Sequence, residues 1–371
     1  MIYLLLTWLA APLLWWRAAC QKSKHGRILV IQTAKIGDFV ATTPVFRALR
    51  QRLPQHRIVA LLHPINAPLA QGLDSIDQII ELPASGFKGW AGKRWLLEQL
   101  AGGYDGVLIL SPNLTSLLAP FWAGIAQRVS VLPDRRQGSA RLAWPFLTHG
   151  QAHQNGQQFR ETALRALAGL GIRVDDGLLA LPNEIARSAA GDARAQALQE
   201  HAPKPWVGLG LGAGNRMKAL DSRQIIEIAT QILKFSNASL VLIGTEADRP
   251  GADALRAVLP AGRMIDSVGQ WTLGELPSLL TNLSCFVGVD SGATYLADAV
   301  GVPVVDYMGP ADANDQRPRG ERAVVIRSGE PCAPCSHAFD APYRCPLGTR
   351  ACITGTPIAS LVEQVLRELG K

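Results

Sequence analysis

Short apolar runs alternate with helix-like stretches along most of the chain. In the first half, five apolar runs are bounded by polar residues or glycine, which is typical of buried strands. They cover residues 28–31, 58–62, 78–82, 106–110 and 128–132. Helices are predicted between them, for example over 45–53 and 95–100. Strands that alternate with helices favour a parallel sheet with helices on both faces.

The same rhythm restarts in the second half. The predicted strands are 206–211, 240–243, 285–289, 302–307 and 323–326, and the predicted helices are 222–235, 251–258, 273–281 and 294–300. Before them, the polar and basic stretch 133–156 indicates a loop, and a helix is predicted over 157–170.

These patterns predict an α/β protein with two Rossmann-like, doubly wound domains that face a cleft. The first domain covers 25–182, a hinge covers 183–204 and the second domain covers 205–356. A terminal helix within 357–371 is expected to return towards the first domain. In such sheets ligands bind beyond the carboxyl ends of the strands.

Residues 1–24 form an apolar segment with a basic flank. Residues 1–16 carry no charge, but sixteen residues is fewer than the ~20 of a typical membrane span. The interfacial residues are Trp8, Pro12, Trp15 and Trp16, and the flanking cations are Arg17, Lys22 and Lys24. A cleaved signal peptide fits less well without a basic start, and Cys20 matches a lipoprotein site only faintly. We therefore expect a membrane anchor that adds nothing to the sheet, with the rest of the chain cytoplasmic.

Composition and charge restrict the partners. The 371 residues are 48% hydrophobic and 18% charged, so the chain is not intrinsically disordered. The net charge of +7 and the pI near 9.3 favour anionic partners, although a basic surface without a specific partner is the alternative. No nucleic-acid-binding module is recognisable, so no nucleic acid is expected as a partner.

The stretch "ILVIQTAKIGDFVATTP" combines a strand, a short loop and a helix start. Thr43 is predicted to cap the helix and Pro44 to occupy its first position. The usual glycine fingerprint of a phosphate site is missing, and Asp38 follows Gly37 in its place. From the residues alone, Asp38 is either a functional carboxylate or a plain capping or turn residue.

Two stretches of the second half have the features of anion sites. "GLGLGAGNRMK" follows a strand, and its Gly212, Gly214 and Lys218 could approach and neutralise a diphosphate, although the glycines could also serve only tight sheet packing. "FVGVDSGATYLADAVGVP" leads from a strand into a helix whose first amides follow Ser291. Here Asp290 is either part of an anion site or a simple helix cap.

Four of the six cysteines lie within about twenty residues near the end of the chain. They are Cys332, Cys335, Cys345 and Cys352. Four thiolates could hold a structural zinc ion, although the spacing matches no standard zinc knuckle. Free buried thiols and a redox pair are the alternatives, and His337 could be a substitute ligand or a surface residue.

Taken in order, these motifs resemble those of glycosyltransferase family 9, which includes the lipopolysaccharide heptosyltransferases. The resemblance extends from about residue 27 to residue 369 through "ILVIQTAKIGDFVATTPVFRALR", "GLGLGAGNRMKAL", "LVLIGTEADR" and "VGVDSGATYLADAVGVPVVDYMGP". It implies the GT-B fold and an inverting transfer of heptose from ADP-heptose to a lipid-linked core. No cofactor would be required for catalysis.

The resemblance also implies roles for individual residues. Asp38 would be the catalytic base and Lys218 would stabilise the departing diphosphate. Asp290, Ser291, Gly292 and Thr294 match the phosphate- and sugar-binding loop, and either Glu246 or Asp248 matches the nucleotide-binding acid. The family usually has histidine where this chain has Tyr295, which puts the donor's identity in question.

These expectations describe a membrane-attached heptosyltransferase on the cytoplasmic face of a Gram-negative inner membrane. Its partners would be a nucleotide-sugar donor, a lipid-linked glycan acceptor and the anionic membrane surface. The cations Arg135, Arg136, Arg317 and Arg319 either hold the acceptor or are ordinary surface residues. Two alternatives remain: an enzyme that uses another nucleotide sugar, and a catalytically silent binding protein for envelope assembly.

Overall fold

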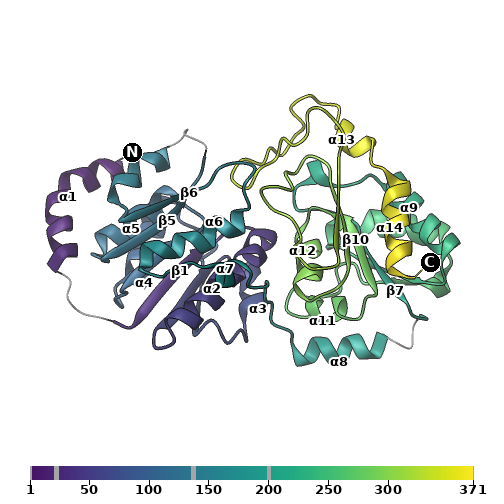
Figure 1. The fold of residues 1–371 in the computed structure, drawn as a ribbon, viewed down its shortest axis with the longest axis horizontal. Helices are drawn as coiled ribbons and strands as arrows, with labels where there is room; N and C mark the ends of the chain where they lie inside the picture. Colours follow the sequence, from purple (N-terminus) through teal and green to yellow (C-terminus); the bar gives the residue numbers. More distant parts are fainter. Residues whose placement is uncertain (1, 21–24, 135–138, 199–201, 371) are drawn as a thin grey trace. The chain divides into compact units, whose positions relative to one another are not determined.

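The chain forms two compact units, Met1–Asn183 and Glu184–Lys371. The computed structural model describes residues 2–20, 25–134, 139–198 and 202–370. In each unit, helices cover a parallel sheet (Figure 1). The predicted cations Lys22, Lys24, Arg135 and Arg136 lie outside the described residues.

The first unit contains a six-stranded sheet with the order β3-β2-β1-β4-β5-β6. The strands are β1 (Arg27–Gln32), β2 (Arg57–Leu62), β3 (Gln78–Glu81), β4 (Gly106–Ile109), β5 (Gln127–Leu132) and β6 (His149–Ala152). The helices are α1 (Ile2–Cys20), α2 (Ile36–Arg52), α3 (Ala67–Ala70), α4 (Gly89–Leu100), α5 (Leu114–Trp122), α6 (Phe159–Arg165) and α7 (Asp176–Leu179), with the 3-10 helices η1 (Pro64–Asn66), η2 (Ser139–Phe146) and η3 (Ala166–Leu170). All five predicted strands are present.

The predicted loop 133–156 is wrong in part, because it contains η2 and β6. Strand β6 has the sequence HGQA and pairs with β5 at the edge of the sheet. It lacks an apolar alternation, so its pairing depends on the backbone and left no signal in the sequence.

The predicted start of the first helix at Thr43 and Pro44 is also wrong. Helix α2 begins at Ile36 and carries Pro44 in its interior. A proline there cannot donate to the carbonyl of Val40, four residues earlier. The Thr43 hydroxyl instead donates to that carbonyl at 2.8 Å, which offsets the missing bond. Asp38 therefore lies in the first turn of a helix.

The second unit repeats the topology, with the order β12-β11-β10-β7-β8-β9. Its strands are β7 (Trp206–Gly210), β8 (Ser239–Ile243), β9 (Met264–Asp266), β10 (Cys285–Val289), β11 (Val304–Met308) and β12 (Ala323–Arg327). Its helices are α8 (Ala189–Ala197), α9 (Ser222–Phe235), α10 (Arg249–Val258), α11 (Leu276–Leu280), α12 (Gly292–Ala299), α13 (Ala351–Thr354) and α14 (Ile358–Glu368), with η5 (Arg216–Lys218), η6 (Glu246–Asp248) and η7 (Ala261–Arg263). The three-residue edge strand β9 was not predicted.

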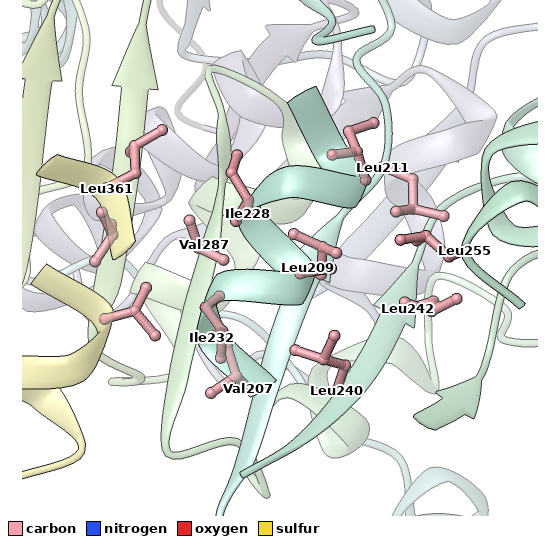
Figure 2. Close-up of a cluster of buried hydrophobic side chains, with 14 of the residues drawn as sticks. Val207, Leu209, Leu211, Ile228, Ile232, Leu240, Leu242, Leu255, Val287 and Leu361 are labelled. Carbon is pink, nitrogen blue, oxygen red and sulfur yellow. The ribbon is translucent and has the colours of Figure 1, made fainter. Parts of the chain in front are cut away.

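The terminal helix is built into the second unit and does not stand apart from it. Leu361 of α14 packs with Ile228 of α9 and Val287 of β10 in the main core of this unit (Figure 2). The predicted hinge helix α8 likewise packs on α11, where Ser278 Oγ donates to the Ser188 carbonyl at 3.4 Å. The return of α14 towards the first unit stays a prediction.

The apolar segment packs on the first unit, whereas the sequence predicts an anchor that adds nothing to the sheet. Helix α1 is long and apolar enough to cross a membrane by length and composition. However, Tyr3, Leu4, Ala11 and Leu14 are buried in the core of the first unit, against α5. One side of α1 is therefore part of the fold.

Candidate functional site

The order of strands reverses at one point in each sheet, between β1 and β4 in the first unit and between β7 and β10 in the second. At such a point the loops that leave neighbouring strands diverge, which opens a crevice for ligands. The predicted site residues Asp38, Lys218 and Asp290 all follow one of these four strands.

In the first unit, the loops after β1, β2 and β4 are tied together. The backbone N–H of Thr33 donates to Ser111 Oγ at 2.8 Å, and Asn66 Nδ2 donates to the Ala34 carbonyl at 2.9 Å. Ser111 and Asn66 follow β4 and β2, so these bonds hold the loop that precedes Asp38 from both sides.

The backbone of Asp38 is fixed although its side chain is only half-buried. Its carbonyl accepts bonds from Thr42 Oγ1 at 2.9 Å and from the buried Gln32 Nε2 at 3.3 Å. The first turn of α2 places Asp38 near the positive end of the helix dipole. An ionised carboxylate on a fixed backbone can accept a proton from a hydroxyl group.

The second unit brings Lys218 and Asp290 together. Lys218 ends η5 in the loop after β7, Asp290 directly follows β10, and their side chains form an ion pair. Both side chains are largely buried, with 17% and 11% of their surface exposed. The Tyr295 hydroxyl donates to the other carboxylate oxygen, Asp290 Oδ1, at 2.8 Å. Asp290 therefore orients the lysine ammonium and is itself held by Tyr295.

Asp290 is not the N-cap of α12, so the interpretation of this residue as a simple helix cap is wrong. The N-cap is Ser291, whose side chain makes no capping bond. Ser291 Oγ lies 3.1 Å from Thr294 Oγ1, and the buried Thr294 hydroxyl donates to the Val289 carbonyl at 2.6 Å. Thr294 thus fastens the turn, and Gly292 and its neighbours begin the helix beside the ion pair.

A further carboxylate, which the sequence analysis missed, lies in the strand next to Asp290. Asp306 of β11 pairs in register with Gly288 of β10 and is fully buried. Within the described residues, neither of its carboxylate oxygens has a hydrogen-bond partner. Burial, and secondarily the charge of Asp290, raise the pKa of Asp306 well above its usual value. The one signal in the sequence is an aspartate inside the apolar run "VPVVDYM".

The two predicted nucleotide-binding acids have different surroundings. The buried Asp248 accepts bonds from the Thr245 backbone and hydroxyl at 2.9 Å each, and from Arg216 Nη1 at 2.6 Å. Glu246 is exposed, and its carboxylate lies 3.6 Å from Arg249 Nε. Asp248 therefore shapes the loop, and Glu246 presents its carboxylate to solvent.

The glycines at the end of β7 and in the loop after it serve mostly packing. A Cβ on Gly210 would come within 2.9 Å of Phe286, and one on Gly212 within 2.2 Å of Asp248 Oδ1. A Cβ on Gly214 would meet nothing within 4 Å. Close packing therefore explains why residue 212 is a glycine. Of the glycines in "GLGLGAG", Gly214 is the one that faces open space among the described residues.

The four clustered cysteines surround one cavity of about 190 Å³, which Met217 and Arg350 also line. None of the four is in a disulfide. The Cys345 sulfur accepts the Arg350 backbone N–H at 3.4 Å, and this bond is the main cause that lowers the pKa of Cys345. Burial raises the pKa of Cys335 and Cys352, and the neighbouring thiols raise it further.

His337 does not join the cysteines. Its Nδ1 lies 3.0 Å from Asp315 Oδ2 and 3.4 Å from Asp312 Oδ2. Among the described residues, the ligand atoms of Asp312, Asp315 and His337 all lie within 4.8 Å of one another. The sulfur atoms of the clustered cysteines do not lie that close together. Residues 332–352, which carry the four cysteines, form the cysteine loop. This loop contacts the loop of Lys218, because Asn215 Nδ2 donates to the Pro342 carbonyl at 2.8 Å.

The chain matches a known family over both units. The family model for "Glycosyltransferase family 9 (heptosyltransferase)" covers residues 94–342. A lipooligosaccharide heptosyltransferase 2 from Haemophilus ducreyi is 24% identical over 317 residues, which is 81% of this chain and 88% of that protein.

Solved structures have the same fold. A glycosyltransferase family 9 structure from Veillonella parvula gives a TM-score of 0.76 at 18% identity, with 94% of this chain and 98% of that one covered. The E. coli ADP-heptose heptosyltransferase II gives 0.72 at 20% identity, with 92% and 98% covered. A dodecameric glycosyltransferase from enterotoxigenic E. coli, TibC, described as iron-containing, gives 0.56 at 16% identity, with 92% and 76% covered.

Proposed function

Because the chain belongs to glycosyltransferase family 9, the heptosyltransferase family, we propose that it transfers heptose from ADP-heptose to a lipopolysaccharide core acceptor with inversion. The observation that carries this proposal is the Lys218–Asp290 pair beside the start of α12, at the point where the second sheet reverses its order. The names of the Haemophilus and E. coli relatives support the donor and the class of acceptor.

In the proposed reaction the second unit binds the donor. The first amides of α12 and the Lys218 ammonium face the diphosphate. The negative charge of the diphosphate then competes with the Asp290 carboxylate for the ion pair with Lys218. The exposed Glu246 contacts the nucleoside. Burial raises the pKa of Asp306 in the neighbouring strand β11, which favours its neutral form and so limits the negative charge near the phosphates.

The first unit supplies the base. The acceptor oxygen attacks the anomeric carbon while the bond from that carbon to the diphosphate oxygen breaks, and ADP leaves with the electron pair. Asp38 takes the proton of the acceptor hydroxyl.

A nucleotide-release assay with a panel of sugar nucleotides tests this proposal. With a core acceptor, ADP-heptose should give release well above the acceptor-free rate. Release with another sugar nucleotide alone would favour the alternative donor, which Tyr295 in place of the family's histidine keeps open. No release with any donor would favour a catalytically silent binding protein.

We also propose that the cysteine loop holds a structural metal ion. Its four thiols line one cavity without a disulfide, and a bound metal ion would draw their sulfur atoms closer together than they lie in the structure. Thiolates bind both zinc and iron. Zinc was the expectation from the sequence, and the description of TibC points to iron. Elemental analysis of protein purified without chelator should find about one metal ion per chain. Cys335→Ser should lose it and lower the Tm, whereas metal-free protein with unchanged Tm would contradict the proposal.

For its location, we propose the cytoplasmic face of the inner membrane. The apolar helix α1 and the exposed Arg17 that follows its apolar part support attachment to an anionic membrane surface.

A further inference from the structure

Helix α1 has two apolar faces with different surroundings. The inner face, which includes Tyr3, Leu4 and Leu14, is buried in the first unit. The outer face is formed by Leu5, Trp8, Leu9, Leu13, Trp15 and Trp16, all of which are exposed. Leu9 is 81% exposed and Trp16 is 66% exposed. No charged residue occurs in α1 before Arg17.

The inner face is attached by specific contacts as well as by apolar packing. Trp122 Nε1 of α5 donates to Thr7 Oγ1 at 2.8 Å, and the Tyr3 ring stacks on Trp122 with centroids 6.3 Å apart. Trp8 of the outer face is 46% exposed, and it also packs edge-on against Phe146 at 4.8 Å. To cross a bilayer on its own, α1 would have to leave these partners and expose the core surface that it covers.

Neighbouring elements extend the apolar outer face. Trp90 of α4 is 60% exposed and meets the Tyr3 ring edge-on at 6.3 Å. Leu142 is exposed on η2. Trp8 and Trp15 of α1 contact the same element at Phe146. Four of the nine tryptophans of the chain are therefore exposed on or beside α1. Tryptophan is enriched where a protein meets the headgroup region of a bilayer.

Cations border this face. Lys93 Nζ lies 5.5 Å from the Tyr3 ring centre and 5.7 Å from that of Trp90. Arg141 lies over the ring of Trp144 in η2, and the exposed Arg17 follows the last tryptophan of α1. An apolar surface with a basic border is complementary to a membrane that carries anionic lipid headgroups.

We propose that α1 lies in the plane of the membrane surface, with its inner face on the first unit and its outer face, Trp90 and Leu142 in one anionic lipid leaflet. The helix then attaches the folded unit directly to the bilayer and does not span it. This inference deepens the location given above and rests on it, but it is independent of the sugar donor.

Vesicle flotation without any nucleotide tests the surface. The full-length protein should float with vesicles of phosphatidylethanolamine and phosphatidylglycerol, and less with phosphatidylcholine alone. The double variant Leu9→Glu/Leu13→Glu should bind at least about tenfold more weakly, with the Tm unchanged because both side chains are exposed. The matched control is Phe235→Glu/Val258→Glu, two exposed apolar residues of the second unit, and it should bind like the wild type.

A topology measurement separates the in-plane helix from a spanning one. A protease site placed ahead of Met1 should be cut by protease added to sealed, inside-out inner-membrane vesicles without detergent. Cutting only after detergent would show that α1 spans and would overturn the proposal. Unchanged flotation of the Leu9→Glu/Leu13→Glu variant would also overturn the proposal. A wild-type protein that forms dimers and does not float would overturn it too. None of these results depends on transferase activity, so they leave the proposed reaction to its own test.

Discussion

At the scale of single residues, Asp38 has the clearest predicted effect. Asp38→Asn should leave the affinity for the donor intact and reduce turnover by about 10²–10⁴, the usual loss for a missing general base. Asp176→Asn, a change in the first turn of α7 in the same unit, is the matched control and should keep full turnover. Turnover of Asp38→Asn near the wild-type rate would show that another group takes the proton.

Lys218 should matter for both binding and chemistry, because the charge on a leaving diphosphate grows during the reaction. Lys218→Ala should weaken ADP binding and lower turnover. It also leaves the largely buried Asp290 without its cation, so Lys218→Ala/Asp290→Asn separates the two effects. The double variant should recover stability and not turnover. Recovery of turnover would assign Lys218 a purely structural role.

Asp306 should make the folded protein less stable as the pH rises. Its pKa is raised in the folded state, so the unfolded chain loses this proton first as the pH rises above about 4. The free energy of unfolding should then fall by about 1.4 kcal/mol per pH unit until the folded pKa is reached. Asp306→Asn cannot titrate, so its stability relative to the wild type should increase from pH 4 to pH 8. A constant difference in urea titrations across this range would mean that Asp306 is ionised in the fold.

At the scale of elements, α1 has to be treated as part of the first unit. Deletion of residues 1–24 removes the buried side chains of Tyr3, Leu4 and Leu14, and should cost on the order of 5 kcal/mol. The truncated protein should unfold at lower denaturant concentration than the full chain in the same detergent, and should aggregate without it. Equal midpoints would indicate that α1 is a separate anchor, as its sequence first suggested.

At the scale of the whole molecule, the apolar strands and their alternation with helices were readable from the sequence, since buried parallel strands are nearly continuous apolar runs. The edge strands β6 and β9 were not, because they are short and have few apolar residues. Thr43 and Pro44 imitate a helix start, and only the hydroxyl bond to Val40 shows why α2 tolerates the proline. The Lys218–Asp290 pair joins loops 72 residues apart, and nothing local in either loop predicts their contact.

We propose that this one chain both binds an ADP-sugar and transfers the sugar. Its most direct test measures ADP release and glycosylated acceptor in the same reaction, with ADP-heptose and a heptose-deficient core acceptor. One product molecule should form for each ADP released, with the anomeric configuration inverted relative to the donor. ADP release without a glycosylated product, or a product that retains the donor's configuration, would contradict it.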